Sequence, residues 1–271
     1  MEVRKYQMTL AFRGTAYHGF QVQQNARTVC QTFQDAVEAA FGVRYPVKGC
    51  SRTDAGVHAN RFVLTMDCPQ ALPCGAMVRA LNNRLPGDIA VLDCALAPPD
   101  FHPRYSCLGK RYIYQIWNSQ VKNPFLEDLA FQVRSVIDTG LANRAAGMFL
   151  GRRDFSALCA AGGGVEDRVR TVCDCRVDRR GDLITLSVTG DGFLYNMVRI
   201  LAGTVLEAAF GRLAPEEIAG VLDSRDRGRA GPTLPPHGLF LDRVFYDAGA
   251  LAAECPHWQK EVVRHGADHP V

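Results

Sequence analysis

Hydrophobic side chains recur along the chain at two spacings, one typical of helices and one typical of strands. Thr28 stands before apolar side chains that follow at helical spacing as far as Phe41, and Gly42 comes next. Because threonine caps helix N-termini and glycine ends helices, this pattern predicts a helix over residues 28–41. In KRYIYQIWN, by contrast, β-branched and aromatic side chains predict a strand.

Similar patterns predict the other elements. Strands are expected in TLAF, YPVKGC, RFVLTMDC, IAVLDCALA and GLFLDRVFYD, and RVRTVCDCRVDRRGDLITLSVTG reads as a hairpin that turns near Gly181. Helices are expected over residues 75–84 and in LANRAAGMFLG, NMVRILAGTVLEAAFG and PEEIAGVLD. Strands and helices are mixed without strict alternation, so the predicted fold class is α+β.

Each half of the chain can bury one face of a mostly antiparallel sheet under two helices. We therefore expect two related α+β domains, with a boundary in the turn around Cys107 to Gly109. The N-terminal domain would cover residues 1–107 and the C-terminal domain residues 108–247. Residues 248–271 have no clear pattern, and we expect a tail there that lies along the surface or is partly disordered.

Composition limits the class of protein. The 271 residues are 47% hydrophobic, which suits a globular core, but no apolar run reaches the roughly 18 residues that span a bilayer, so no membrane role is expected. The ten cysteines are scattered, and we expect reduced thiols in a cytoplasmic protein. Cys173 and Cys175 alternate in a predicted strand and would share one face of it. No second pair completes a zinc site, so no metal is expected.

The charge of the chain is compatible with a polyanionic partner. The net charge is only +3, but most of the 31 basic residues are arginines, whose planar fork matches phosphate. Charged residues on solvated loops are the commoner case, so composition does not establish such a partner. Basic positions in or beside loop-like segments include Arg104, Lys110, Arg111, Arg152, Arg153, Arg225, Arg227 and Arg229.

The segment GCSRTDAGVHAN, residues 49–60, places a carboxylate, an arginine and a histidine among small residues. Small neighbours let the backbone turn sharply and approach a bulky ligand, which would suit Asp54 as a reactive carboxylate. In the alternative interpretation, Asp54 caps a turn, Arg52 is its surface ion-pair partner and His58 is an ordinary loop histidine. Spacing alone favours this alternative.

Within that segment, SRTDAGVHA resembles the active-site signature of the TruA family of tRNA pseudouridine synthases. The resemblance covers residues 6–246 in family order, through AFRGTAYHGFQVQ, LNNRLPGDIAV, DFHPRYSCLGKRYIYQIWN, DFSAL, FLYNMVRILAG and HGLFLDRVFY. It implies two α+β domains around a basic cleft that holds the active site, usually in a homodimer. It also implies isomerisation of uridine to pseudouridine in the anticodon stem-loop of tRNA, at positions 38, 39 and 40, without a metal or organic cofactor.

The reaction explains three residues of the signature. Breaking the N1 glycosidic bond, turning the uracil and rejoining it through C5 requires a carboxylate beside C1′, and Asp54 matches the family's nucleophile. The sequence leaves open whether Asp54 attacks the sugar or the ring. The target uridine must flip out of its stack, and Arg52 is the candidate to contact phosphate and hold it, with His58 as a further substrate-binding residue.

The resemblance assigns three more residues in the second half of the chain. Tyr112 matches a tyrosine that stacks on the target base, although a strand tyrosine can also be a core residue. Arg199 matches an arginine that pairs with the catalytic aspartate and keeps it ionised and oriented. Leu239 matches an apolar residue packed against the base, and on its own it would read as core.

The sequence departs from the family pattern at two positions, and two other functions were weighed against it. Ser51 and Phe62 stand where the family often has glycine and glutamine, and neither replaces a reacting group. A non-catalytic RNA-binding module or chaperone would share the basic surface, but it would not need the aspartate, tyrosine and arginine together. A glycoside hydrolase normally needs a second carboxylate, and none is evident near the signature.

Overall fold

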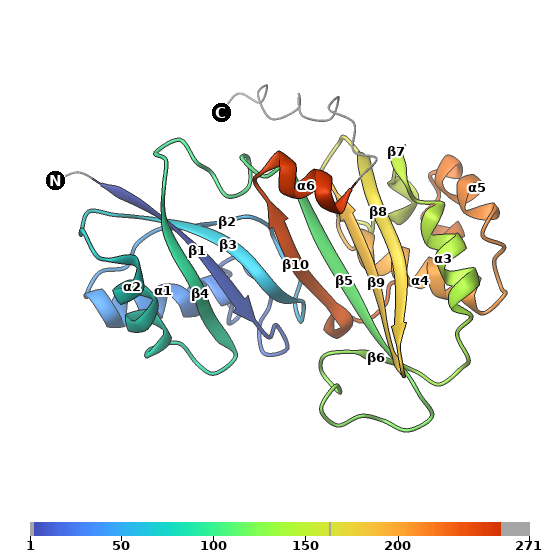
Figure 1. Ribbon diagram of the computed structural model, residues 1–271, viewed down its shortest axis with the longest axis horizontal. Coiled ribbons are helices and arrows are strands. Elements are labelled where there is room, and N and C mark those ends of the chain that lie inside the picture. The colour runs from blue at the N-terminus through green and yellow to red at the C-terminus, as the bar shows by residue number, and fades with distance from the viewer. Residues whose placement is uncertain (1–2, 163, 256–271) are drawn as a thin grey trace. The chain divides into compact units, whose positions relative to one another are not determined.

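The computed structural model describes residues 3–162 and 164–255, which fall into two compact units (Figure 1). Among these residues, the first unit contains residues 3–107 and Leu241–Tyr246, and the second contains Leu108–Phe240 and residues 247–255. Leu241–Tyr246 therefore belong to the first unit, whereas they were predicted to lie in a continuous second domain, 108–247. Within the described residues, no helix is long and apolar enough to cross a bilayer.

The first unit is built on an antiparallel sheet. Its strands are β1 (Arg4–Phe12), β2 (Val47–Gly49), β3 (His58–Cys68), β4 (Ile89–Ala97) and the part of β10 (Leu239–Phe245) that starts at Leu241. β1 pairs with β3 on one side and β4 on the other, while β2 and β10 lie beside β3. Tyr6, Met8 and Leu10 alternate with less buried residues along β1, as expected for a sheet with one covered face.

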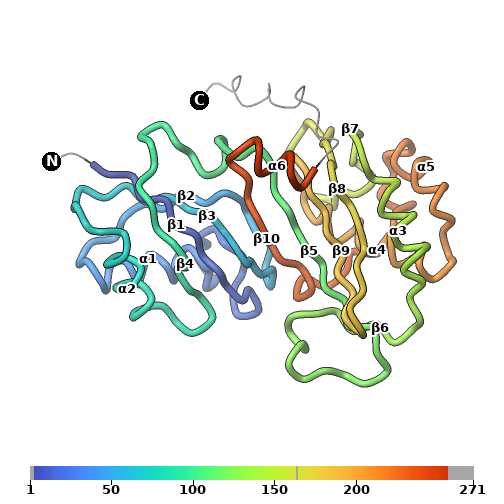
Figure 2. Tube along the Cα trace, in the orientation of Figure 1, coloured from blue at the N-terminus to red at the C-terminus, as the bar shows by residue number. Residues whose placement is uncertain are grey.

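Two helices complete the first unit. α1 (Val29–Phe41) begins where the Thr28 hydroxyl accepts a hydrogen bond from the backbone N–H of Gln31 at 3.3 Å, and it ends at Gly42, which has a φ of 74°. Both helix signals read from the sequence are thus confirmed. α2 (Cys74–Asn82) packs against α1 and β4, and the two helices run close together in Figure 2.

The second unit has its own antiparallel sheet, with strands in the order β5-β9-β8-β7 and the short β6 parallel to β5. The strands are β5 (Gly109–Asn118), β6 (Phe131–Val133), β7 (Gly151–Asp154), β8 (Val169–Arg180) and β9 (Leu183–Gly190). β8 and β9 form the predicted hairpin, which turns through Gly181 at a φ of 60°. The two units therefore agree with the predicted α+β class.

The helices of the second unit are α3 (Thr139–Gly147), α4 (Met197–Ala209), α5 (Glu217–Ser224) and α6 (Ala248–Glu254). Short 3-10 turns occur at Ser156–Leu158, Arg227–Arg229 and Pro236–Gly238. Almost every residue of α4 is buried, which explains why its sequence is largely apolar. α4 contacts α3 and β5, so it forms the centre of this unit's core.

The C-terminal segment differs from the expected tail. Residues 248–254 form α6, in which Asp247 caps the N-terminus and the buried Leu251 packs 3.1 Å from the position that a Cβ of Gly109 would take. Arg111 and Glu254 add an ion pair at 2.8 Å. The remainder of the predicted tail, 256–271, lies outside the described residues.

The cysteines of β8 also differ from the prediction. Cys173 forms a disulfide with Cys255, 82 residues further on, so the expectation of reduced thiols fails for this pair. The register of β8 shifts between Val172 and Asp174, which places Cys173 in a β-bulge, whereas Cys175 is a free thiol buried in the core. The bulge breaks the side-chain alternation on which the predicted shared face of Cys173 and Cys175 depended. The prediction of a shared face is therefore wrong.

Candidate active site

The candidate nucleophile Asp54 lies in the link between β2 and β3, here called the Asp54 loop (residues 50–57). The backbone N–H of Val57 donates to the carbonyl of Asp54 at 3.2 Å, closing a turn in which Gly56 has a φ of 78°. Asp54 is half-buried and Arg52 is exposed. Since β3 begins at His58, the loop is shorter than the 49–60 segment suggested, and its end is tied directly to the sheet.

A second loop, residues 13–20, braces the Asp54 loop through its backbone. The N–H of Gly14 donates to Nδ1 of His58 at 2.9 Å, and His58 is completely buried. A Cβ on Gly14 would lie 1.9 Å from the carbonyl oxygen of Val57, and one on Gly19 would lie 2.2 Å from that of Thr53. Only residues without a side chain allow this approach, so both glycines are needed to hold the Asp54 loop in place.

Tyr17 adds a third point of attachment between the two loops. Its carbonyl accepts the N–H of Gly56 at 3.1 Å, and its hydroxyl donates to Oδ1 of Asp88 at 2.7 Å. Burial and the neighbouring Asp88 raise the pKa of Tyr17 to about 12, so the phenol stays protonated at neutral pH. The guanidinium of Arg27 lies over the Tyr17 ring, 4.9 Å from its centroid.

Sequence reasoning missed this bracing. Gly14, Tyr17 and Gly19 all fall in AFRGTAYHGFQVQ, a segment that carries part of the family resemblance but in which no residue was assigned a role. The structure also gives His58 a structural contact, in addition to the substrate-binding role expected from its place in the signature. The hydroxyl of Thr53 is buried without a hydrogen-bond partner among the described residues, so a polar group entering the loop would relieve its desolvation cost.

The other predicted site residues belong to the second unit, each on a regular element or at its end. Tyr112 lies on β5 and is 7% exposed, with its ring edge-on to Phe193 at a centroid distance of 5.1 Å. Leu239 is the first residue of β10 and is also buried. The burial of Tyr112 and Leu239 fits the alternative in which they are core residues. The contact with Phe193 fixes the plane of the Tyr112 ring.

Arg199 lies on α4, and its guanidinium donates hydrogen bonds to a backbone carbonyl and to a side-chain amide. Its Nε donates to the carbonyl of Leu234 at 2.6 Å, and its Nη1 donates to Oδ1 of Asn196 at 2.7 Å. A guanidinium anchored in this way has a defined plane, which suits it to carboxylate or phosphate recognition. The sequence pointed to Arg199 but not to its two acceptors.

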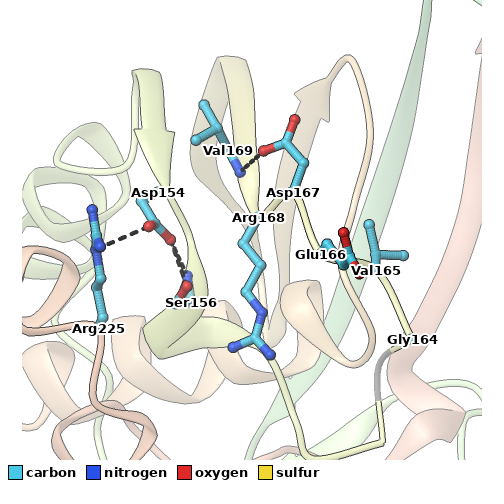
Figure 3. A pocket seen from close by; sticks show the side chains of 9 residues that line it. All are labelled: Asp154, Ser156, Gly164, Val165, Glu166, Asp167, Arg168, Val169 and Arg225. Carbon is cyan, nitrogen blue, oxygen red and sulfur yellow. Dashed lines mark hydrogen bonds and ion pairs between the residues drawn. The ribbon is translucent and has the colours of Figure 1, made fainter.

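A hollow of about 740 Å³ lies elsewhere on the second unit, between the start of β8 and the end of α5 (Figure 3). Asp154 accepts hydrogen bonds there from Ser156 and is paired with Nε of Arg225 at 2.9 Å. Partial burial acts to raise the pKa of Asp154, but these hydrogen bonds and Arg225 hold it below its ordinary value. None of the residues expected to be catalytic lines this hollow.

The site residues thus divide between the units: Arg52, Asp54 and His58 in the first, Tyr112, Arg199 and Leu239 in the second. A carboxylate on a braced turn can act as a nucleophile or a base, because its position is set before substrate arrives. In the described part of the chain, no group of three or more His, Cys, Asp or Glu side chains is placed to hold a metal ion.

Comparison with known proteins identifies the family. The family model described as tRNA pseudouridine synthase matches residues 8–106 and 145–247, which include Asp54, Arg199 and Leu239, while Tyr112 lies between the matched segments. The tRNA pseudouridine synthase A of Acetivibrio thermocellus is 39% identical over 244 residues, covering 90% of this chain and 100% of the relative. Those of Myxococcus xanthus and Bacillus subtilis are 40% and 38% identical, covering 92% and 88% of this chain and 94% and 98% of the relatives. With both a family model over most of its length and full-length relatives at this identity, the chain belongs to the tRNA pseudouridine synthase family.

Proposed function

We propose that this chain isomerises uridine to pseudouridine at positions 38, 39 and 40 in the anticodon stem-loop of tRNA, with Asp54 as the nucleophile. The observation that carries the proposal is the Asp54 loop: a half-buried carboxylate on a turn that two glycines and a buried histidine hold in place. Such rigidity is what a nucleophile needs, because displacement by about 1 Å can cost 100-fold in rate.

The carboxylate can start the reaction by either of two routes. In the first, an oxygen of Asp54 bonds to C1′ as the C1′–N1 bond breaks and its electron pair leaves with the uracil, which turns and bonds to C1′ through C5 while Asp54 departs. In the second, an oxygen of Asp54 bonds to C6 of the uracil as the C5=C6 electron pair shifts toward O4, the C1′–N1 bond breaks and C5 bonds to C1′, and Asp54 leaves C6 as the C5=C6 bond forms again. Both routes end with loss of the C5 proton, protonation of N1 and a free carboxylate, so atoms and electrons balance without a cofactor.

The remaining site residues act on the same nucleotide in this proposal. Arg52, which is exposed beside the nucleophile, contacts a phosphate of the flipped uridine. Tyr112 and Leu239 present an aromatic face and an apolar surface to the base, and Arg199 pairs with Asp54. His58 serves substrate binding through the loop that it holds.

The proposal extends to the assembly and location of the protein. We propose a homodimer, in which a second copy enlarges the basic surface available to a tRNA, acting in the cytoplasm where tRNA is modified. No metal or organic cofactor is required, because the isomerisation transfers no net electrons and needs only a nucleophile and proton transfer.

The test is pseudouridine mapping on a defined substrate. The purified chain is incubated with an unmodified tRNA transcript that has uridine at positions 38, 39 and 40, and with a matched transcript that has cytidine there. We expect pseudouridine at these positions in the first transcript and none in the second. Tight binding of both transcripts without product would instead support the non-catalytic RNA-binding alternative, and product elsewhere would contradict the assigned positions.

A further inference from the structure

The residue before α4 has an unusual backbone conformation. Asn196 has a φ of 60° and a ψ of 7°, in the left-handed region, and among the described non-glycine residues only Arg225 shares a positive φ. This region costs residues with a Cβ about 1–2 kcal/mol, although asparagine tolerates it better than most. Such conformations persist where surrounding interactions compensate for them.

Asn196 does not perform the usual task of an asparagine at a helix N-cap. The side chain normally accepts a hydrogen bond from one of the first backbone N–H groups of the helix, but here no such cap is made. Its Oδ1 accepts instead from Nη1 of Arg199, at 2.7 Å. The side chain is therefore used to hold the guanidinium, one helical turn further on.

The backbone of residues 231–234 provides the second anchor of Arg199. The Leu234 carbonyl accepts from Arg199 Nε at 2.6 Å, and the Leu234 N–H donates back to the Arg199 carbonyl at 3.3 Å. This segment lies tightly against α4, because a Cβ on Gly203 would be 1.9 Å from the carbonyl oxygen of Pro232. The guanidinium is thus held by one fixed backbone group and one side chain.

We propose that Asn196 is a positioning residue for the isomerisation, which fixes the guanidinium of Arg199 in its productive orientation. This inference rests on the proposed function, because it assumes that Arg199 acts on the nucleophile. An arginine side chain has many rotamers, and holding one of them in advance removes an entropic cost from the reaction. The left-handed backbone at Asn196 aims its side chain along the helix toward Arg199, which connects the conformation to the hydrogen bond.

Three substitutions separate conformation from hydrogen bonding. Asn196→Gly accepts the positive φ and removes Oδ1, Asn196→Asp keeps an oxygen acceptor, and Asn196→Ala loses both advantages. The control is Asn143→Ala, because Asn143 on α3 also makes side-chain hydrogen bonds, both to the backbone of Val177 on β8. The measurements are single-turnover pseudouridine formation at saturating tRNA, tRNA affinity and the midpoint of urea unfolding.

We expect Asn196→Gly to slow the single-turnover rate by about 10- to 100-fold, the loss associated with a hydrogen bond to a charged group, while tRNA affinity changes less than about threefold. Asn196→Asp should recover most of that rate. Asn143→Ala should lower the urea midpoint with no comparable loss of rate. A wild-type rate for Asn196→Gly would overturn the proposal, as would a rate loss that Asn196→Asp does not recover.

A double-mutant cycle with Arg199→Lys identifies the path of the effect. If Asn196 acts through Arg199, then Asn196→Gly should slow the Arg199→Lys variant by less than about twofold, because the bonded guanidinium is already gone. An equal slowing in both backgrounds would show a purely structural role and refute the proposal. If Arg199→Lys itself has the wild-type rate, the proposed function of Arg199 fails instead. NMR of the Arg199 guanidinium, whose signals are assigned by comparison with Arg199→Lys, gives a readout even where turnover is too slow to measure. The guanidinium should rotate more freely in Asn196→Gly than in wild type. Unchanged rotation would count against the proposal.

Discussion

Replacement of Gly19 by alanine should displace the candidate nucleophile through its backbone, without changing its carboxylate. Gly19 has a φ of 80°, and a Cβ there would lie 2.2 Å from the carbonyl oxygen of Thr53 and 3.3 Å from the carbonyl carbon of Asp54. The nearest atom is backbone and not the end of a flexible side chain. The Asp54 loop must therefore move by roughly 1 Å to accept the methyl group.

The expected magnitude follows from this displacement. A shift of about 1 Å in a reacting group can cost about 100-fold in rate, so the single-turnover rate should fall by about that factor. The positive φ adds a separate cost of about 1–2 kcal/mol to the free energy of folding. Gly42→Ala is the matched control, since Gly42 has a φ of 74° with no atom within 4 Å of its Cβ position.

The assay follows release of tritium from C5 of uridine in tRNA, with filter binding and urea unfolding measured in parallel. Gly42→Ala should lose stability but keep its rate, whereas Gly19→Ala should lose both. Comparable rates in the two variants would refute the reasoning, because they would show that the contact between Gly19 and Thr53 does not set the position of Asp54.

Three further predictions address other parts of the molecule. Gly203→Ala should lower the free energy of unfolding by about 1–3 kcal/mol, because its Cβ would clash with Pro232, and an unchanged urea midpoint would contradict this. Asp154 has a lowered pKa, so its pairing with Arg225 stabilises the fold above the ordinary pKa of 3.8, and this stabilisation is lost as pH falls below that value. Asp154→Asn should therefore flatten the acid side of the plot of unfolding free energy against pH, and an unaltered acid side would count against the pair. Arg152 is exposed on β7. If it contacts a tRNA phosphate, Arg152→Gln should reduce the slope of log affinity against log salt by about 0.7–0.9. A slope equal to that of wild type would show that there is no such contact.

Elements controlled by neighbouring residues were predictable from the sequence. α1 begins after Thr28 and ends before Gly42 because capping chemistry acts over three or four residues. The hairpin of β8 and β9 follows from a glycine between two strands of strong β-propensity. The signature around Asp54 was equally visible, because its residues are adjacent in the chain.

Features that depend on distant contacts were not predictable. α6 has little pattern of its own and is held by the packing of Leu251 and by the ion pair of Arg111 with Glu254. The two residues of this ion pair are 143 positions apart. The bulge at Cys173 reverses the alternation of a strand that otherwise looks regular. Each of these outcomes is a tertiary effect that overrides local preference.

The candidate site shows the same division. Asp54 and Arg199 could be named from motifs, but the anchoring of Arg199 by Leu234 links residues 35 positions apart. Gly14 and Gly19 look like ordinary loop glycines until the Asp54 loop is seen against them. The proposed site residues were therefore visible in the sequence, and the residues that support them were not.

The central claim is that Asp54 is the nucleophile of a tRNA pseudouridine synthase. Asn at this position keeps the shape of the side chain and removes the nucleophilic carboxylate, so Asp54→Asn tests the claim with little disturbance of the loop. Single-turnover pseudouridine formation and tRNA affinity are measured on the same preparation, with the urea midpoint confirming that the variant is folded. We expect no detectable pseudouridine and a dissociation constant within about threefold of wild type. Pseudouridine formation near the wild-type rate in folded Asp54→Asn would contradict it.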